Sequence, residues 1–183
     1  MNSAVLIGCF VSAAMIGSAI AARSESPHAG EESRPIKALS TDDVEAYLAG
    51  KGMGLAKAAE LNGYPGPLHV LALSSELALT ADQKQRTESL FAAMESKAIA
   101  AGRRLVDEER KLDRLFASKT IDRRSLERSL KRIGELQAEV RRVHLETHLA
   151  QIRILSPAQV SSYMALRGYS NPMRTEGHFG HKH

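Results

Sequence analysis

A pattern of five residues occurs twice in this chain of 183 residues, as LTADQ at 79–83 and as LSPAQ at 155–159. Both copies place a hydroxyl residue three positions before a glutamine, which is the spacing of a helix capping box. In such a box the hydroxyl accepts the amide hydrogen of the third helical residue, and the glutamine side chain accepts that of the capping residue. The pattern therefore predicts two helix starts. Its residues are Leu79, Thr80 and Gln83 in the first copy and Leu155, Ser156 and Gln159 in the second.

The chain between the two boxes has helical periodicity. Apolar residues recur at alternating spacings of three and four from the first box to about Ser118, and again from about Arg123 to Ile154. The connection at 119–122 is short, with Asp122 as the expected cap, so the two long helices must form an antiparallel hairpin. Two thin amphipathic helices cannot bury both flanks alone, which predicts a homodimer. The expected fold is thus all-α, a long antiparallel helical hairpin with short flanking helices.

Short helices are expected on both sides of the hairpin. They run from Ser40 to about Ala49, from 55 to 61, from 68 to about 78, and from the second box to about Arg167. The apolar residues of 68–78 cover more than half of the helix circumference, so we expect this helix to be largely buried. The helical domain would then span residues 40–169. Its segment 50–67 is rich in glycine and proline, and the sequence assigns it no activity.

The first 22 residues have the features of a secretory signal peptide. Residues 3–22 are uncharged and mostly apolar, and Ala19 and Ala21 form a small-residue cleavage site. Cleavage near Ala21 or Ala22 would deliver the protein to the periplasm. The alternative is an uncleaved inner-membrane anchor that faces the periplasm, since about 20 apolar residues can span a bilayer. Residues 23–39 and 170–183 lack periodicity and are expected to be a disordered linker and a disordered tail.

Histidines are the candidate ligands for a metal ion. The only cysteine, Cys9, would leave with the signal peptide. His144 and His148 are four residues apart on a predicted helix, the spacing that lets two imidazoles reach one ion. The alternative is a pair of half-buried histidines without a ligand. The tail histidines His178, His181 and His183 would hold a divalent metal weakly, or would simply be solvated.

Two other functional classes are disfavoured by the sequence. No nucleophile motif, metalloprotease motif or nucleotide-binding loop is present, so we expect that the protein is not an enzyme. The net charge is +4, but aromatic residues make up only 4% of the chain and Trp is absent. Binding of single-stranded nucleic acid relies on stacking aromatics, so we expect no nucleic-acid partner.

The two boxes, placed around a long charged helical stretch behind a predicted export signal, resemble the LTxxQ-motif family of periplasmic proteins. This Spy/CpxP-like family includes chaperones, zinc-resistance-associated proteins with His-rich termini, and CnrX-type heavy-metal sensors. The resemblance covers roughly residues 68–169 and implies a bent helical hairpin. CnrX-type sensors complete their site from the helix before the first box. By that resemblance His69 and Glu76 would join His144 and His148 around zinc, nickel, cobalt or copper.

The chain departs from those sensors in one respect, because its helix before the first box has a single histidine where they have a pair. The resemblance implies a periplasmic metal-binding protein that acts in heavy-metal sensing or resistance, or in envelope stress, with a membrane-bound signalling partner. The first alternative is an ATP-independent chaperone that holds unfolded envelope proteins in a basic and apolar cradle. The second alternative is a structural coiled-coil module with neither activity.

Overall fold

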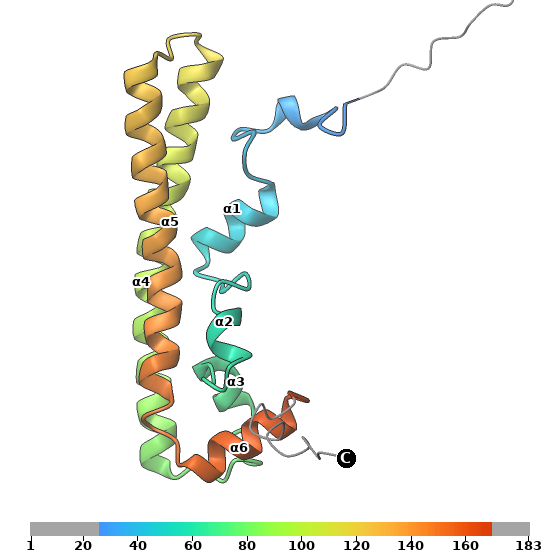
Figure 1. Ribbon diagram of the computed structural model, residues 1–183, viewed down its shortest axis with the longest axis vertical. Coiled ribbons are helices and arrows are strands. Elements are labelled where there is room, and N and C mark those ends of the chain that lie inside the picture. The colour runs from blue at the N-terminus through green and yellow to red at the C-terminus, as the bar shows by residue number, and fades with distance from the viewer. Residues whose placement is uncertain (1–25, 170–183) are drawn as a thin grey trace, which may run out of the picture. The chain divides into compact units, whose positions relative to one another are not determined.

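The computed structural model describes residues 26–169, which contain helices, turns and loops but no strand (Figure 1). The chain divides into two compact units, one ending at Glu32 and the other starting at Ser33. All elements from α1 onward belong to the second unit. The elements are a short 3₁₀ helix, Glu31–Ser33, and six α-helices: α1 Thr41–Leu48, α2 Lys57–Glu60, α3 Pro67–Ala72, α4 Ala81–Ala117, α5 Arg123–Gln151 and α6 Pro157–Leu166.

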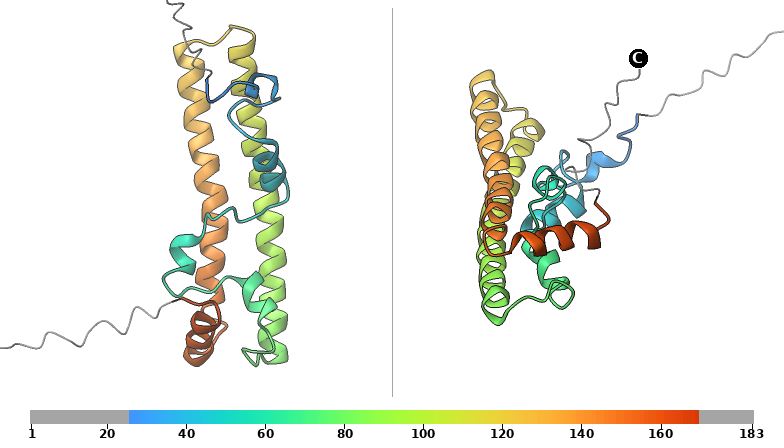
Figure 2. Two further views of the ribbon diagram at one scale, coloured as in Figure 1. Left: turned by 90° about the vertical axis from the view of Figure 1, so that its right-hand side faces the viewer. Right: turned by 60° about the horizontal axis from the view of Figure 1, so that its bottom comes forward.

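Helices α4 and α5 form the predicted antiparallel hairpin and pack side by side along their length (Figures 1 and 2). Asp122 caps α5, and its side chain accepts a hydrogen bond of 2.7 Å from the Ser125 amide. The all-helical fold with a long hairpin and short flanking helices is therefore confirmed, while the homodimer stays a prediction. The core of the hairpin is a cluster of buried apolar residues: Ala101, Leu105, Ile133, Leu136 and Val140. Burial of each large side chain among them contributes about 1.5–3 kcal/mol to the stability of the fold.

A strap of short elements, residues 41–72, lies along the hairpin (Figure 2). Helix α1 packs on α4, α2 packs on α5, and α3 touches both long helices. The approach of α1 is so close that a side chain at Gly102 would overlap the backbone carbonyl of Tyr47. A glycine inside a long helix is otherwise unfavourable, so this contact explains its presence.

Helix α3 differs from the prediction in length and burial. It ends at Ala72, about six residues early, because turns follow and Ala78 adopts a left-handed conformation with φ of 47°. Val70 and Leu77 are buried as expected, but Leu68 is 56% exposed. Only Val70 and Leu77 of residues 68–78 are buried, so the expectation that this segment is largely buried was wrong.

The folded part also begins before residue 40. Ile36 is buried, with 3% of its surface exposed. The backbone amide and the ammonium group of Lys37 each donate a 3.0 Å hydrogen bond to the Asp113 carboxylate on α4. These contacts fix part of the segment 23–39 that we expected to be a disordered linker.

Both predicted capping boxes form, and they contact each other. Thr80 and Gln83 exchange hydrogen bonds at the start of α4, as do Ser156 and Gln159 at the start of α6. The Gln83 side-chain amide donates to Gln159 Oε1 at 2.8 Å, and the Gln159 amide donates to Gln83 Oε1 at 3.0 Å. We call this pair the glutamine clasp. It joins the first turn of α4 to the first turn of α6.

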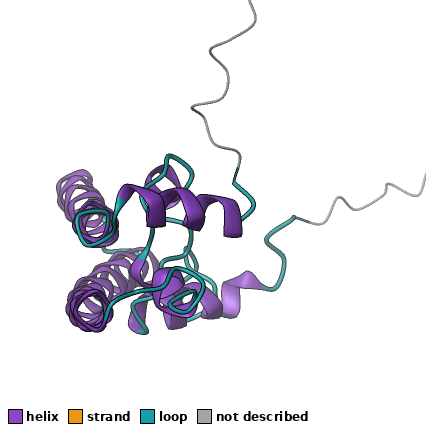
Figure 3. Ribbon diagram, turned by 90° about the horizontal axis from the view of Figure 1, so that it is seen from below, coloured by secondary structure: helices purple, strands orange, loops and turns teal. Residues whose placement is uncertain are grey.

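The clasp lies beside a second apolar cluster, which connects α3 and the following turn to α6. Helix α6 leaves the direction of α5 at the end of the hairpin and runs out to the side on which the strap lies (Figures 1 and 3). Its Tyr163 is fully buried, and Gly168, with φ of 71°, ends the helix region. The bend therefore has a packed core of its own, formed by Val70, Leu77, Leu155, Tyr163 and Met164.

The predicted signal peptide at 1–22 and the predicted tail at 170–183 lie outside the described residues. Within residues 26–169, no helix is long and apolar enough to cross a membrane.

Candidate functional site

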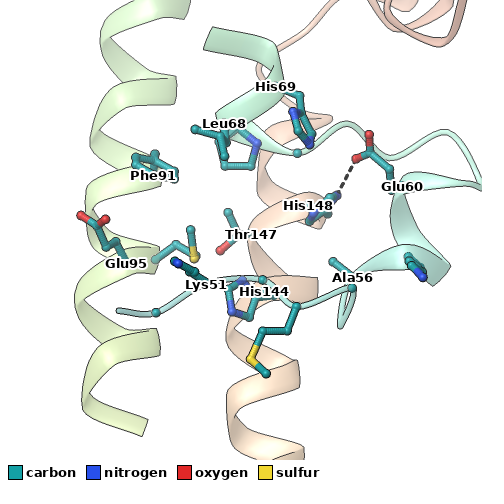
Figure 4. A pocket seen from close by; sticks show the side chains of 18 of the residues that line it. Lys51, Ala56, Glu60, Leu68, His69, Phe91, Glu95, His144, Thr147 and His148 are labelled. Atoms are coloured by element: carbon teal, nitrogen blue, oxygen red, sulfur yellow. Dashed lines mark ion pairs between the residues drawn. The ribbon is translucent and has the colours of Figure 1, made fainter. Parts of the chain in front are cut away.

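A cavity of about 500 Å³ lies between the hairpin and the strap. Figure 4 shows α4 on one side, α5 on the other, and strap residues between and above them. Its wall is mostly apolar with a few polar groups, which is typical of small-ligand sites. The lining residues used below are Glu60, Gly66, His69, His144, His148 and Arg167.

His148 is held in a defined orientation by the strap. It is buried, and its Nδ1 lies 2.7 Å from the backbone carbonyl oxygen of Tyr64. A carbonyl can only accept a hydrogen bond, so Nδ1 carries the hydrogen and Nε2 of the neutral ring has a free lone pair. Histidines that ligate metals are oriented by the same type of backbone hydrogen bond. Only glycine fits at Gly66, because a Cβ there would lie 2.8 Å from His148 Cε1.

His144, one turn earlier on α5, has a buried nitrogen without a partner. The residue is 5% exposed, and no described group forms a hydrogen bond with its Nε2. Burial, with a smaller contribution from the nearby His148, lowers the pKa of His144 and favours the neutral ring. A buried polar atom left unpaired costs about 1–3 kcal/mol, so it indicates either strain or a missing ligand.

His69 supplies the third imidazole from α3. It is half-buried and lies on the same side of the cavity as His148 and Glu60 (Figure 4). Burial lowers its pKa first, the Arg167 charge lowers it further, and the Glu60 carboxylate acts in the opposite direction. The structure therefore brings all three predicted histidines from the described residues to one cavity.

Glu76, the fourth predicted ligand, is not part of this cavity. It is exposed on the turn after α3 and is absent from the lining. We expected it to share a helix face with His69, but α3 ends at Ala72 and that face does not extend to Glu76.

The carboxylate in the cavity is Glu60, which sequence reasoning missed. Its Oε2 lies 3.8 Å from His148 Nδ1 (dashed line in Figure 4). Glu60 belongs to α2, which has only four residues within the glycine- and proline-rich segment. A short helix was expected at 55–61, but a helix of this length has no periodicity that would place Glu60 against α5, so the sequence offers no signal for the role of this residue.

Glu60 also connects the strap to the C-terminal part of the fold. Its Oε1 accepts hydrogen bonds from the hydroxyls of Tyr163 at 2.5 Å and Tyr169 at 3.3 Å. The same oxygen lies 3.6 Å from Nε of Arg167. Burial, followed by the hydrogen bond to Glu60, strongly raises the pKa of the Tyr163 hydroxyl, which stays a donor. One oxygen of Glu60 therefore anchors α6, and the other faces His148.

The ligand groups are near one another but do not form a finished metal site. Among residues 26–169, no set of three or more His, Cys, Asp or Glu side chains is spaced to hold an ion. The tail histidines His178, His181 and His183 lie outside the described residues. The orphaned Nε2 of His144 and the free lone pair of His148 do fit a metal that prefers nitrogen ligands.

Comparison with known proteins adds no relative. No family model matches the sequence, and no curated protein and no solved structure is significantly similar to it.

Proposed function

We propose that the protein is a periplasmic metal-binding protein of the LTxxQ-motif type that acts in heavy-metal sensing or resistance. Its ion would be a divalent transition metal such as zinc, nickel, cobalt or copper, held by His69, His144 and His148. The observation that carries the proposal is the meeting of these three imidazoles at one cavity, one of them with a buried and unpaired Nε2. A bound ion would fill the coordination that this nitrogen lacks.

The chemistry of the donor set supports this assignment. Neutral imidazoles suit zinc, copper and nickel, and burial favours the neutral form of His144 and His69. The carboxylate next to His148 is Glu60, in place of the expected Glu76. It would act as an oxygen ligand or as the group that orients His148.

The incomplete convergence of the ligands favours a sensor over a storage site. A ligand shifts a conformational equilibrium only when it binds one state more tightly than the other. An ion that is fully coordinated only when His69 of the strap has moved toward α5 would bind that state more tightly than the state described here. Through Glu60, the same movement would reach Tyr163 of α6 and Arg167.

Metal titration by calorimetry on residues 23–183 tests the proposal. Replacing His144, His148 or His69 with Ala should weaken the affinity by about tenfold or more, because a ligand is lost. His28→Ala is the matched control, since His28 is exposed and belongs to the other unit. Deleting residues 170–183 should reduce the number of weakly bound ions and leave the tight site intact. A His144→Ala/His148→Ala double variant that still binds one equivalent tightly would refute the assignment.

A holding chaperone is the second candidate, favoured by the large apolar side chains on the surface. Leu61 and Leu68 of the strap are each more than half exposed, as is Phe116 near the hairpin tip. Weak and adaptable client binding uses surfaces of this kind. Suppression of client aggregation without ATP, unaffected by the His144→Ala/His148→Ala change, would favour this function. A structural module would show neither metal binding nor suppression.

The expected homodimer is part of the same proposal. Sedimentation equilibrium at tens of micromolar tests it, and a monomer at that concentration would exclude it.

A further inference from the structure

A second cavity, of about 450 Å³, lies on α4 toward the hairpin tip. One face of α4 forms most of its wall, with residues at spacings of three and four, and the segment before α1 forms the remainder. It shares no lining residue with the histidine cavity. The residues that line it are Lys37, Ala38, Glu109, Leu112, Asp113, Phe116 and Ala117.

Glu109 is a buried carboxylate without a partner. It is 8% exposed, and no hydrogen bond or ion pair reaches it from the described residues. Burial raises the pKa of this carboxyl group, and no neighbouring charge lowers it. The Glu109 oxygens are not among the fully buried polar atoms of the described residues, so the carboxylate opens onto the cavity and is accessible to a cationic ligand.

The nearby Lys37 does not pair with Glu109. Both the backbone amide and the ammonium group of Lys37 are bound to Asp113, at 3.0 Å each. These hydrogen bonds lower the pKa of Asp113, in contrast to Glu109. The cavity therefore contains one satisfied carboxylate and one unsatisfied carboxylate, with no free cation among its lining residues.

The rest of the wall is apolar and includes an aromatic ring. Phe116 is 54% exposed, and Leu112 and Ala117 lie on the same face of α4. The face of an aromatic ring attracts a cation, and the aliphatic side chains favour an apolar group beside it. The volume suits a small ligand or a single large side chain.

We propose that this cavity binds an organic cation, in which an ammonium or guanidinium group pairs with Glu109 and an apolar body packs on Leu112 and Phe116. The site is separate from the proposed metal site and does not depend on it. The ligand is either a free amphipathic amine or a basic side chain of a peptide, since both present the same chemistry.

Titrations followed by NMR amide shifts test the proposal, with phenethylammonium as the free cation. We expect shifts confined to residues around Glu109 and Phe116. The neutral analogue 2-phenylethanol should bind at least tenfold more weakly to the same protein, because it lacks the charge. This comparison tests the charge without any substitution. Equal binding of the two compounds would overturn the proposal.

Substitutions then identify the carboxylate. Glu109→Gln keeps the shape and removes the charge, and it should weaken phenethylammonium binding at least tenfold. Phe116→Ala should weaken it by a smaller factor. Asp107→Asn is the control, because Asp107 is exposed on the same helix and pairs with Arg110. Unchanged affinity in Glu109→Gln would overturn the proposal.

A second ligand separates the two sources of the cation. The blocked peptide Leu-Lys-Leu should bind more tightly than phenethylammonium if the natural ligand is a polypeptide side chain, and more weakly if it is a free amine. Absence of saturable binding by both at about 20 mM would overturn the proposal, since millimolar affinity is the lower limit of specific recognition.

Discussion

The half-buried glutamine clasp and the histidine cavity are both polar clusters built from residues far apart in the sequence, yet they differ in how completely they are bonded. Each clasp amide uses its two hydrogens and both acceptor sites of its oxygen. Gln83 also donates to the Ile154 carbonyl at 2.9 Å, and Gln159 donates to the Leu77 carbonyl at 3.1 Å. In the histidine cavity, by contrast, His144 Nε2 has no partner among residues 26–169.

Under the proposed function, the clasp is a structural cluster and the histidine cavity is one prepared for a ligand. A fully satisfied network makes one arrangement of the chain more stable than its alternatives. An open coordination position stabilises nothing until a ligand fills it, and its cost has to be offset by packing elsewhere. Removing a clasp side chain should therefore lower the free energy of unfolding, whereas removing the His144 imidazole should leave it nearly unchanged or raise it.

The largest effect is expected in the clasp. Gln159→Ala removes half of a capping box, both hydrogen bonds between the two glutamines and the partner of the Leu77 carbonyl, so the free energy of unfolding should fall by about 3 kcal/mol. Urea denaturation measures the change. Gln137→Ala, at an exposed position of α5, should stay within about 0.5 kcal/mol of the wild type. A loss no larger than that of the control would show that the clasp is not structural.

A smaller effect is expected where the strap crosses α4. Gly102→Ala should lower the free energy of unfolding by about 1–3 kcal/mol, because the new methyl group overlaps the Tyr47 carbonyl. Gly134→Ala on α5 is the matched control, since a Cβ there meets no atom within 4 Å. It should stabilise the protein by about 0.5–1 kcal/mol through helix propensity. A lower free energy of unfolding in Gly102→Ala, together with a higher one in Gly134→Ala, would support the contact between the strap and α4. Changes of the same sign in both variants would contradict that contact.

Substitution of His144 in the histidine cavity should change the free energy of unfolding less than the substitutions in the clasp and at Gly102. His144→Leu removes an unpaired polar atom, so in metal-free buffer at pH 7.5 the free energy of unfolding should change by less than about 1 kcal/mol, or should rise. His148→Leu, which leaves the Tyr64 carbonyl unpaired, should destabilise by more. A loss of about 3 kcal/mol in His144→Leu would mean that this ring is bonded after all.

A last and smaller difference concerns pH. The pKa of His144 is lowered in the folded protein. A histidine in the unfolded chain has a pKa of about 6.5, so below that pH the unfolded chain binds more protons than the folded protein. Stability of the metal-free protein should therefore be full above that pH and should decline as the pH falls toward the folded pKa. Urea midpoints at pH 7.5 and 5.5 measure this decline, which should be weaker in His144→Leu. If the decline were the same in the wild type and in His144→Leu, groups other than His144 would be responsible for it.

Much of the fold could be predicted from the sequence because its determinants are local. The capping boxes, the apolar stripes of α4 and α5, and the Asp122 cap each depend on residues within a few positions of one another. Helix α3 was predicted too long because the apolar residues continue into the turns at 73–78, where Leu77 is buried without being helical.

The cavity was harder to predict, since its parts meet only through tertiary structure. The pair His144 and His148 could be found by spacing, whereas His69 came from a family resemblance and Glu60 was missed. The bonding between Gln83 and Gln159 also has no sequence signal, because each glutamine already has a complete local role in its own box. Glu109 was unremarkable in a charged helix until its burial was known.

The position of the clasp also has a consequence for folding kinetics and mechanics. It joins residues 76 positions apart and so closes the whole hairpin into a loop. Contacts near the tip are close in sequence and should form before this closure, which spans the whole hairpin and therefore has a larger entropic cost. A pulling force applied to the segments that enter α4 and leave α6 would load the two amides before the long helices. The protein should thus open from its bend, with the hairpin as the last part to separate.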